Sequence, residues 1–199
     1  MDTKRIVVGI TGATGAVFGL RLLDALSEAG IETHLVVSRW GQQTVEHECG
    51  VDLAGLRARA SVFHGTGNMA ATISSGSFHT DGMVIAPCSM RTAAAIAHGV
   101  GDSLVHRAAD VILKERRRLV LVPRETPLSE LHLENLLKLA RMGVAIVPPM
   151  PAFYNRPTSV EDIVDHIVAR VLDQFGVTAE FARRWDGKMS HASPVRRIE

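Results

Sequence analysis

The stretch KRIVVGITGATGAVFGLRLLDALSEAG, residues 4–30, decides the fold class. Its first seven residues form an apolar run without alternation, which is typical of a parallel strand covered on both faces. Residues 16–29 carry apolar side chains at helical spacing, and Gly30 ends that pattern. Between strand and helix lies TGATG, residues 11–15, a glycine-rich turn whose backbone N–H groups can meet an anion.

The same strand-then-helix unit repeats along the chain. Further apolar runs of strand length occupy residues 32–38, 81–87, 118–123 and 144–149. Helical patterns occupy residues 103–117, 129–142 and 159–175. This alternation predicts one α/β domain, a doubly wound, Rossmann-like or flavodoxin-like fold of three layers with a mostly parallel sheet. We place the domain at residues 1–186 and a C-terminal tail at residues 187–199.

Composition excludes several functional classes. The chain has 199 residues, 46% of them hydrophobic, and a net charge of +1, so we expect one packed core and no binding of nucleic acid. Its two cysteines, Cys49 and Cys88, indicate no disulfide framework. We find no signal peptide and no run of membrane-helix length, and therefore expect a soluble cytoplasmic protein without a membrane partner.

Polar or turn-forming residues follow every predicted strand. Ligands of doubly wound sheets bind beyond the carboxyl ends of the strands, so these residues are the informative ones. They read TGATG (11–15), SRW (38–40), PCSMRT (87–92), PRETP (123–127) and PPMPAFYNRPT (148–158). We also interpret the polar, glycine-rich segment at residues 65–80 as a functional loop.

The first turn favours a phosphate or a mononucleotide over NAD. Gly9, Gly12 and Gly15 form G-x-x-G-x-x-G, which differs from the dinucleotide pattern G-x-G-x-x-G. The second strand ends in Ser38 and Arg39, where an NAD-binding domain carries an acid. A tight packing turn without a ligand remains the alternative at this point.

The second turn repeats the theme after residues 81–87. Ser89 and Thr92 open a helix there, and a helix N-terminus carries partial positive charge and unpaired N–H groups. Ser89 also fits a simple helix cap. Two such N-termini at neighbouring strand ends can hold a phosphate and the edge of a flat ring. We interpret Cys88 as a small buried residue beside the ligand, because no base for a nucleophile is evident.

Charged and aromatic residues follow the last strands. Arg124 and Glu125 come directly after a buried strand, where a charge needs a partner or a task, such as proton transfer. Tyr154, the only tyrosine, fits a packed loop, and Arg170 by default fits a helix surface. The segment EHEC, residues 46–49, has no second ligand pair at metal spacing, so we predict no metal site.

Together, GITGATGAVFGLRLLDAL, APCSMRT, the stretch from RAADVILKERRRLVLVPRETP to PPMPAFYNRP, and VEDIVDHIVARVLDQFG resemble the UbiX-type flavin prenyltransferases. The likeness runs from about residue 4 to residue 185. It is strongest to the B subunits of bacterial phenolic (hydroxyarylic) acid decarboxylase systems. The resemblance implies that reduced FMN and dimethylallyl phosphate bind, that a prenyl group is joined to flavin N5 and C6, and that phosphate leaves.

The resemblance further implies that the product, prenylated FMN, passes to a partner UbiD-type aromatic acid decarboxylase. It implies no metal, and a homododecamer with active sites between subunits. The implied flavin contacts are Gly12, Ala13, Thr14, Ser38, Ser89, Met90, Arg91, Thr92 and Arg124. The implied prenyl-phosphate contacts are Glu48, Arg107, Lys114, Tyr154 and Arg170.

In the same family pattern, the catalytic set is Thr14, Lys114, Glu125, Tyr154 and Arg170. Many relatives have serine where this chain has Thr14, and Trp185 matches a tryptophan near the site. Without a metal, Lys114, Arg170 and the Tyr154 hydroxyl must meet the charge of the leaving phosphate. Glu125 would accept the proton lost on ring closure, kept ionised by Arg124.

Two other functions remain open from the sequence. One is an FMN-dependent decarboxylase that acts directly on its substrate, as related cysteine decarboxylases do. The other is a non-catalytic FMN carrier within a decarboxylase complex. The prenyltransferase hypothesis differs from both in requiring the anion-binding group of Lys114, Tyr154 and Arg170.

Overall fold

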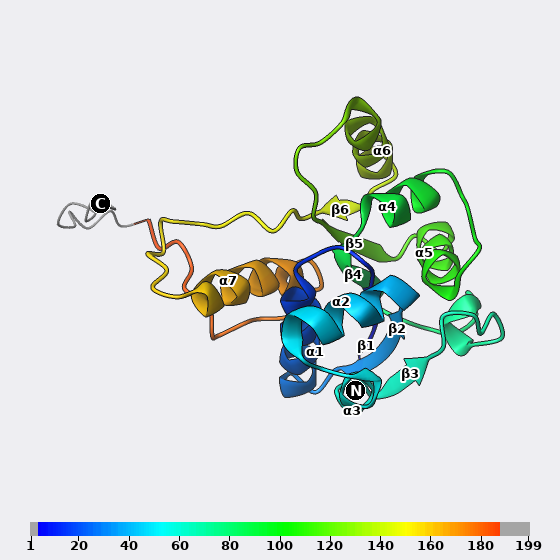
Figure 1. The fold of residues 1–199 in the computed structure, drawn as a ribbon, viewed down its shortest axis with the longest axis horizontal. Helices are drawn as coiled ribbons and strands as arrows, with labels where there is room; N and C mark the ends of the chain where they lie inside the picture. The colour runs from blue at the N-terminus through cyan, green and yellow to red at the C-terminus, as the bar shows by residue number, and fades with distance from the viewer. Residues whose placement is uncertain (1–3, 188–199) are drawn as a thin grey trace.

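Six parallel strands form one sheet in the part of the chain that the computed structural model describes, residues 4–187 (Figure 1). They are β1 (Arg5–Ile10), β2 (Glu32–Val37), β3 (Val62–His64), β4 (Gly82–Cys88), β5 (Arg118–Pro123) and β6 (Ala145–Ile146). Their order is β3-β2-β1-β4-β5-β6, which is the Rossmann order. Without the three-residue β3 it is the flavodoxin order, so the predicted fold class is confirmed.

Helices cover both faces of the sheet. They are α1 (Ala16–Glu28), α2 (Arg39–Cys49), α3 (Leu53–Ala58), the 3-10 turn η1 (Thr72–Ser74), α4 (Met90–Ala97), α5 (Leu104–Lys114), α6 (Glu130–Arg141) and α7 (Val160–Asp173). One buried cluster joins α1 and α7 to the face that carries Val8. A second cluster joins α4 and α5 to the opposite face, which carries Val7. Adjacent strand residues therefore feed two cores, as expected of a three-layer domain.

Most predicted strands and helices agree with the structure, with one strand shorter than predicted and three elements missed. The predicted strand at 144–149 is only the two-residue β6, and β3, α2 and α3 were not predicted. Helix α2 is mostly polar and buries only Gly41 and Val45, so it lacks the apolar period that identifies a helix. The predicted tail, 187–199, lies outside the described residues except for Gly187. No helix within residues 4–187 is long and apolar enough to cross a membrane.

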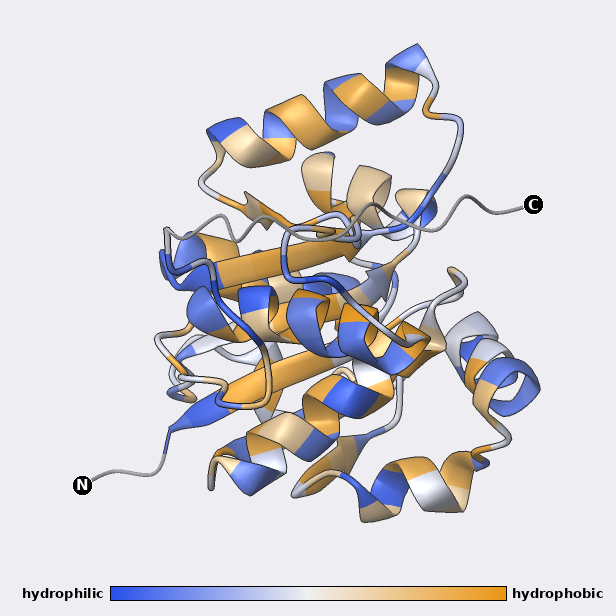
Figure 2. Ribbon diagram, turned by 90° about the vertical axis from the view of Figure 1, so that its left-hand side faces the viewer, coloured by the Kyte–Doolittle hydropathy of each residue, from blue (hydrophilic) through white to orange (hydrophobic). Residues whose placement is uncertain are grey.

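Helix α6 carries apolar side chains on two opposite sides. Its buried residues, Asn135 and Leu139, face α4, and Asn135 Oδ1 lies 2.9 Å from His98 Nε2. Leu133 and Leu137 lie on the other side at helical spacing, with 53% and 50% of their surface exposed. Figure 2 shows this helix at the top of the molecule with apolar bands along its length. A helix that is apolar on two sides is suited to burial between partners.

Candidate active site

A cavity of ≈ 420 Å³ lies beyond the carboxyl ends of β1 and β4. These strands are neighbours in the sheet, but their following helices, α1 and α4, pack on opposite faces. This is the topological switch point at which doubly wound sheets bind ligands. Of the predicted flavin contacts, those that line the cavity are Gly12, Ser38, Ser89, Arg91 and Thr92.

Three helix N-termini, each capped by a serine, meet at this cavity. They open α2, α4 and α5. The backbone N–H groups of Gly41, Thr92 and His106 donate to the hydroxyls of Ser38, Ser89 and Ser103, at 3.0, 3.3 and 3.4 Å. Because each N-terminus carries partial positive charge, together they favour an anion. The sequence predicted the helices that begin after Ser89 and at Ser103, whereas Ser38 was predicted only as a polar residue at a strand end, because α2 itself was not predicted.

The base of the cavity is held by Thr11, which sequence analysis did not single out. Its hydroxyl donates to the Pro87 carbonyl at 2.9 Å and accepts from the Ser89 backbone N–H at 2.8 Å. Thr11 is 2% exposed, so both bonds are shielded from water. They fix the turn after β1 against the turn after β4, and thereby place the start of α4.

The N-terminus of α1 is closed by the protein's own carboxylate. Glu48 Oε2 accepts hydrogen bonds from the backbone N–H groups of Gly15 at 2.9 Å and Ala16 at 2.8 Å. Burial raises the pKa of Glu48, but hydrogen bonds from Thr14 and from these N–H groups outweigh it and lower the pKa. In the single chain, the anion that the TGATG turn meets is therefore the Glu48 carboxylate. Its contact with Thr14 also brings two predicted site residues together.

Gly12 lines the cavity, and close packing against Trp40 also requires glycine at this position. A Cβ atom on Gly12 would lie 2.4 Å from Trp40 Cβ, so only glycine lets α2 begin this close to the turn. Other predicted flavin contacts do not line the cavity. Of these, Ala13 and Met90 are buried, whereas Thr14 and Arg124 are exposed.

Arg124 and Glu125 reach the same edge of the sheet. The Arg124 backbone N–H donates to the Cys88 carbonyl at 3.3 Å, which places both residues next to the turn that starts α4. Glu125 Oε1 accepts from the Thr126 backbone N–H at 3.0 Å, and its side chain is exposed. Within residues 4–187 Glu125 forms no ion pair with Arg124. In the single chain, Arg124 therefore does not contact the Glu125 carboxylate that it was expected to keep ionised.

Cys88 is fully buried at the end of β4. Burial raises the pKa of its thiol to about 12, although the Ala93 backbone N–H lowers it slightly. A thiol that stays protonated is a poor nucleophile, which agrees with the interpretation of Cys88 as a small buried residue. The described part of the chain also holds no group of three or more His, Cys, Asp or Glu side chains suited to a metal ion.

Lys114 and Arg107 lie on α5 and do not line the cavity at the switch point. Lys114 is the last residue of α5 and precedes β5, so it lies at the amino edge of the sheet, where its Nζ pairs with Glu115. The six-residue β5 separates the two edges by roughly 20 Å. Arg107 Nε donates to the Ser74 carbonyl at 3.1 Å. The single chain therefore does not bring Lys114 to the cavity.

Tyr154 and Arg170 lie on the segment that leaves the sheet after β6, seen extending to the left in Figure 1. Tyr154 Oη is 3.5 Å from His166 Nε2, and its ring meets Trp185 edge-on at 5.6 Å. Arg170 pairs with Asp173 at 2.5 Å. Trp185 thus packs on a predicted site residue, but Tyr154 and Arg170 do not line the cavity at the switch point.

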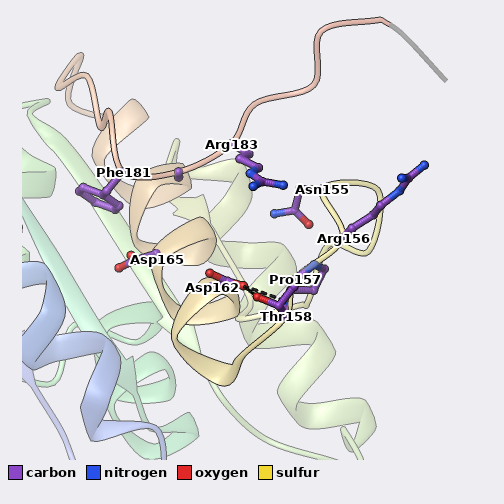
Figure 3. Close-up of a pocket in the computed structure, with 9 residues that line it drawn as sticks. Asn155, Arg156, Pro157, Thr158, Asp162, Asp165, Phe181 and Arg183 are labelled. Atoms are coloured by element: carbon purple, nitrogen blue, oxygen red, sulfur yellow. Dashed lines mark hydrogen bonds between the residues drawn. The ribbon is translucent and has the colours of Figure 1, made fainter. Parts of the chain in front are cut away.

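A smaller pocket of ≈ 120 Å³ lies between residues 155–158 and α7 (Figure 3). Asp162 points to this loop, and its Oδ2 accepts from the Thr158 backbone N–H at 2.6 Å and the Thr158 hydroxyl at 2.8 Å. Asp162 and Asp165 give the pocket carboxylates, and Arg156 and Arg183 give it guanidinium groups. Its volume is too small to hold a flavin.

Comparisons with known proteins agree with this geometry. A family model described as Flavoprotein matches residues 1–172. A probable UbiX-like flavin prenyltransferase of Streptomyces sp. (strain D7) is 63% identical over 96% of each chain. The crystal structure of AnUbiX (PadA1) in complex with FMN and dimethylallyl pyrophosphate has a TM-score of 0.93, with 50% identity over 94% of this chain and 100% of that chain.

A second solved structure is called a dodecameric FMN-dependent UbiX-like decarboxylase from Escherichia coli O157:H7. It has a TM-score of 0.90 and 60% identity, over 92% of this chain and 100% of that chain. These likenesses extend over nearly the whole of each protein and agree with the resemblance in the motifs. The chain therefore belongs to the UbiX-like flavin prenyltransferase family.

Proposed function

We propose that this protein is a metal-independent flavin prenyltransferase. It joins the dimethylallyl group of dimethylallyl phosphate to N5 and C6 of reduced FMN, and the prenylated FMN serves a partner UbiD-type aromatic acid decarboxylase. The observation that carries the proposal is the cavity at the switch point, where three serine-capped helix N-termini meet. The related AnUbiX was crystallised with FMN and the pyrophosphate donor; we choose the monophosphate for this chain.

The residues of the cavity fit FMN. Arg39, Arg91 and the three N-termini provide donors for its phosphate, and the hydroxyls of Ser38, Ser89 and Thr92 provide polar contacts along the wall. When bound, the reduced flavin supplies the electron-rich ring that accepts the prenyl group. The chain's part is to orient that ring and to hold Glu125 at the same edge, where its carboxylate can take up a proton.

The prenyl phosphate is bound by residues of neighbouring copies. Lys114 and the flavin cavity lie on opposite edges of the sheet, so one copy must supply Lys114 to another copy's cavity. Lys114, Arg170 and the Tyr154 hydroxyl meet the charge of the departing phosphate in place of a metal. The exposed apolar side of α6 and the exposed Phe153 and Met150 suit a large assembly, and we propose the homododecamer.

The test is an anaerobic incubation of the purified protein with reduced FMN and dimethylallyl phosphate. We expect a flavin product that is heavier by one prenyl group, with release of inorganic phosphate. The same reaction with the pyrophosphate donor decides between the two donors. If FMN is bound but no prenylated product forms with either donor, the proposal is wrong.

The two alternative functions give different results. A direct decarboxylase, the activity in the name of the Escherichia coli neighbour, would release CO₂ from its substrate without a partner protein. A carrier subunit would still activate its partner after Glu125→Gln. The prenyltransferase predicts no CO₂ release by the chain alone and strongly slowed activation after that change. We also place the protein in the cytoplasm, where its two unpaired cysteines stay reduced.

A further inference from the structure

The flavin cavity contains a carboxylate that an anion-binding site does not explain. Asp102 lies in the cavity wall just before α5, among the helix N-termini and arginines that favour a phosphate. A second residue of the wall, His106, lies one helical turn further on, and its Nδ1 is 2.6 Å from Asp102 Oδ1. Neither residue belongs to the contacts that the family resemblance implies.

The contact with Asp102 fixes which atom of His106 meets a ligand. An ionised carboxylate only accepts hydrogen bonds, so Nδ1 carries the proton that joins the pair. Nε2 is then the one free polar atom of the ring. It has no hydrogen-bond partner among residues 4–187, and it is not sealed from solvent. His106 lines the cavity, and the 9% of its side chain that is exposed leaves Nε2 open to what binds there.

We propose that the Asp102–His106 pair recognises the phosphate of FMN and helps the site to select FMN over riboflavin. This inference rests on the proposed function, since it assumes that FMN occupies the cavity. With phosphate present, His106 Nε2–H donates to a phosphate oxygen while Nδ1–H donates to Asp102. The ring then lies between the phosphate and Asp102 and screens the phosphate from that carboxylate.

The pair differs from the arginines of the cavity in its rigidity. Arg39 and Arg91 are exposed, long and flexible, and they attract any anion. His106 is buried, its backbone N–H is held by Ser103, and its ring is held by Asp102. A donor already held in one orientation loses little entropy on binding. The pair is thus suited to discriminate between ligands that differ by one phosphate group.

The experiment measures the affinity of FMN and of riboflavin by quenching of flavin fluorescence, in the wild type and in His106→Leu. Leucine fills much of the same space but provides no donor and leaves Asp102 facing the phosphate. We expect FMN to bind His106→Leu about tenfold to a hundredfold more weakly, the range of a hydrogen bond to a charged group. Riboflavin should bind both proteins equally. His106→Gln, which keeps an N–H donor, should regain part of the preference for FMN.

Two other outcomes overturn the inference. Equal loss of FMN and riboflavin means that His106 supports the fold or the ring site, not the phosphate. No loss of either means that the pair does not touch the ligand. If His106→Leu does not fold, as judged by circular dichroism, the ratio of the two affinities in His106→Gln and Asp102→Asn decides. If the wild type binds no FMN at all, the proposed function itself has failed.

Discussion

Glu48 Oε2 lies 2.8 Å from the backbone nitrogen of Ala16 and thereby caps the helix that follows the first glycine turn. The carboxylate comes from the C-terminal end of α2, so the bond joins two helices as well as satisfying a helix end. Helix N-termini need such acceptors because their first N–H groups have no partner within the helix. The first glycine turn is therefore completed by a side chain about thirty residues further along the sequence.

Removing this cap should lower stability. We expect Glu48→Ala to reduce the free energy of unfolding by about 1 kcal/mol, the usual value of a lost N-terminal cap, and Glu48→Gln to reduce it less because an acceptor oxygen remains. Urea unfolding followed by circular dichroism measures both. Glu46→Ala, an exposed change in the same helix, is the matched control. Equal stability of Glu48→Ala and Glu46→Ala would show that the cap contributes nothing.

The cap should also make stability depend on acid pH. Since the pKa of Glu48 is lowered in the folded state, the unfolded chain binds its proton first as pH falls. The stabilisation is fully present above the ordinary pKa of 4.5 and is lost as pH falls through the folded value. Melting temperatures recorded below pH 5 should therefore fall more steeply for the wild type than for Glu48→Gln. Parallel curves would contradict this.

A buried histidine pair gives a second pH dependence. His34 Nδ1 and His64 Nε2 are 2.9 Å apart, and His34 Nε2 meets Glu32 at 2.8 Å. Burial, and then the charge of His34, lowers the pKa of His64. The neutral ring is thus favoured on folding, and its contribution is present above about pH 6.5 and is lost as pH falls through the lower folded value. We expect melting temperatures to decline in this range.

The control for this pair is His64→Gln, which keeps a hydrogen-bonding group but does not titrate. Its stability at pH 8 should be lower than that of the wild type, because the contact with His34 is poorer. Between pH 7 and pH 5 its melting temperature should change less. A decline of the same size in both proteins would assign the effect to other groups.

Sharing of the active site between copies can be tested by mixing defects. Lys114→Met and Glu125→Gln should each abolish most activity when made alone. When the two variants are co-expressed and assemble at random, about a quarter of the sites should combine an intact Lys114 from one copy with an intact Glu125 from another. Prenylation should then reappear at about that level. If the mixed assembly stays inactive, both residues must act from the same copy.

The outer side of α6 provides a test of assembly. Leu137→Glu places a charge on the half-exposed apolar side, opposite the buried Leu139. We expect smaller assemblies by analytical ultracentrifugation and a large loss of prenylation, with the fold unchanged, because a buried unpaired charge costs several kcal/mol at an interface. Lys138→Glu, an exposed change between these two residues, should leave the assembly intact. Assembly unaffected by Leu137→Glu would exclude this side as an interface.

The elements that were predicted correctly are those that a local pattern of apolar residues identifies. The apolar runs after Lys4 and before Pro87 have no polar interruption, so their assignment as buried strands was confirmed. Helix α2 was not predicted because its residues are polar and its place depends on packing against α1. The role of Glu48 as a cap was not predicted either, since it depends on how two helices are placed relative to each other.

The candidate site divides in a similar way. Ser38 and Ser89 were predictable because each follows a recognisable strand, and Ser89 also opens a predicted helix. Asp102 and His106 were not, because nothing in the sequence indicates that the start of α5, marked by Ser103, lies at the same cavity as the turns after β1 and β4. The predicted roles of Lys114 and Arg170 came only from the family pattern, and one copy of the chain does not bring them to the cavity.

The opposite placement of Lys114 and the flavin cavity has a consequence for regulation. A newly made chain would contain both Lys114 and the cavity and yet be inactive until it assembles with other copies. Turnover would then vary with protein concentration, because mass action governs how many copies are assembled. Dilution below the dissociation constant of the complex should extinguish prenylation while flavin loading persists. Abundance itself would act as the switch for cofactor supply.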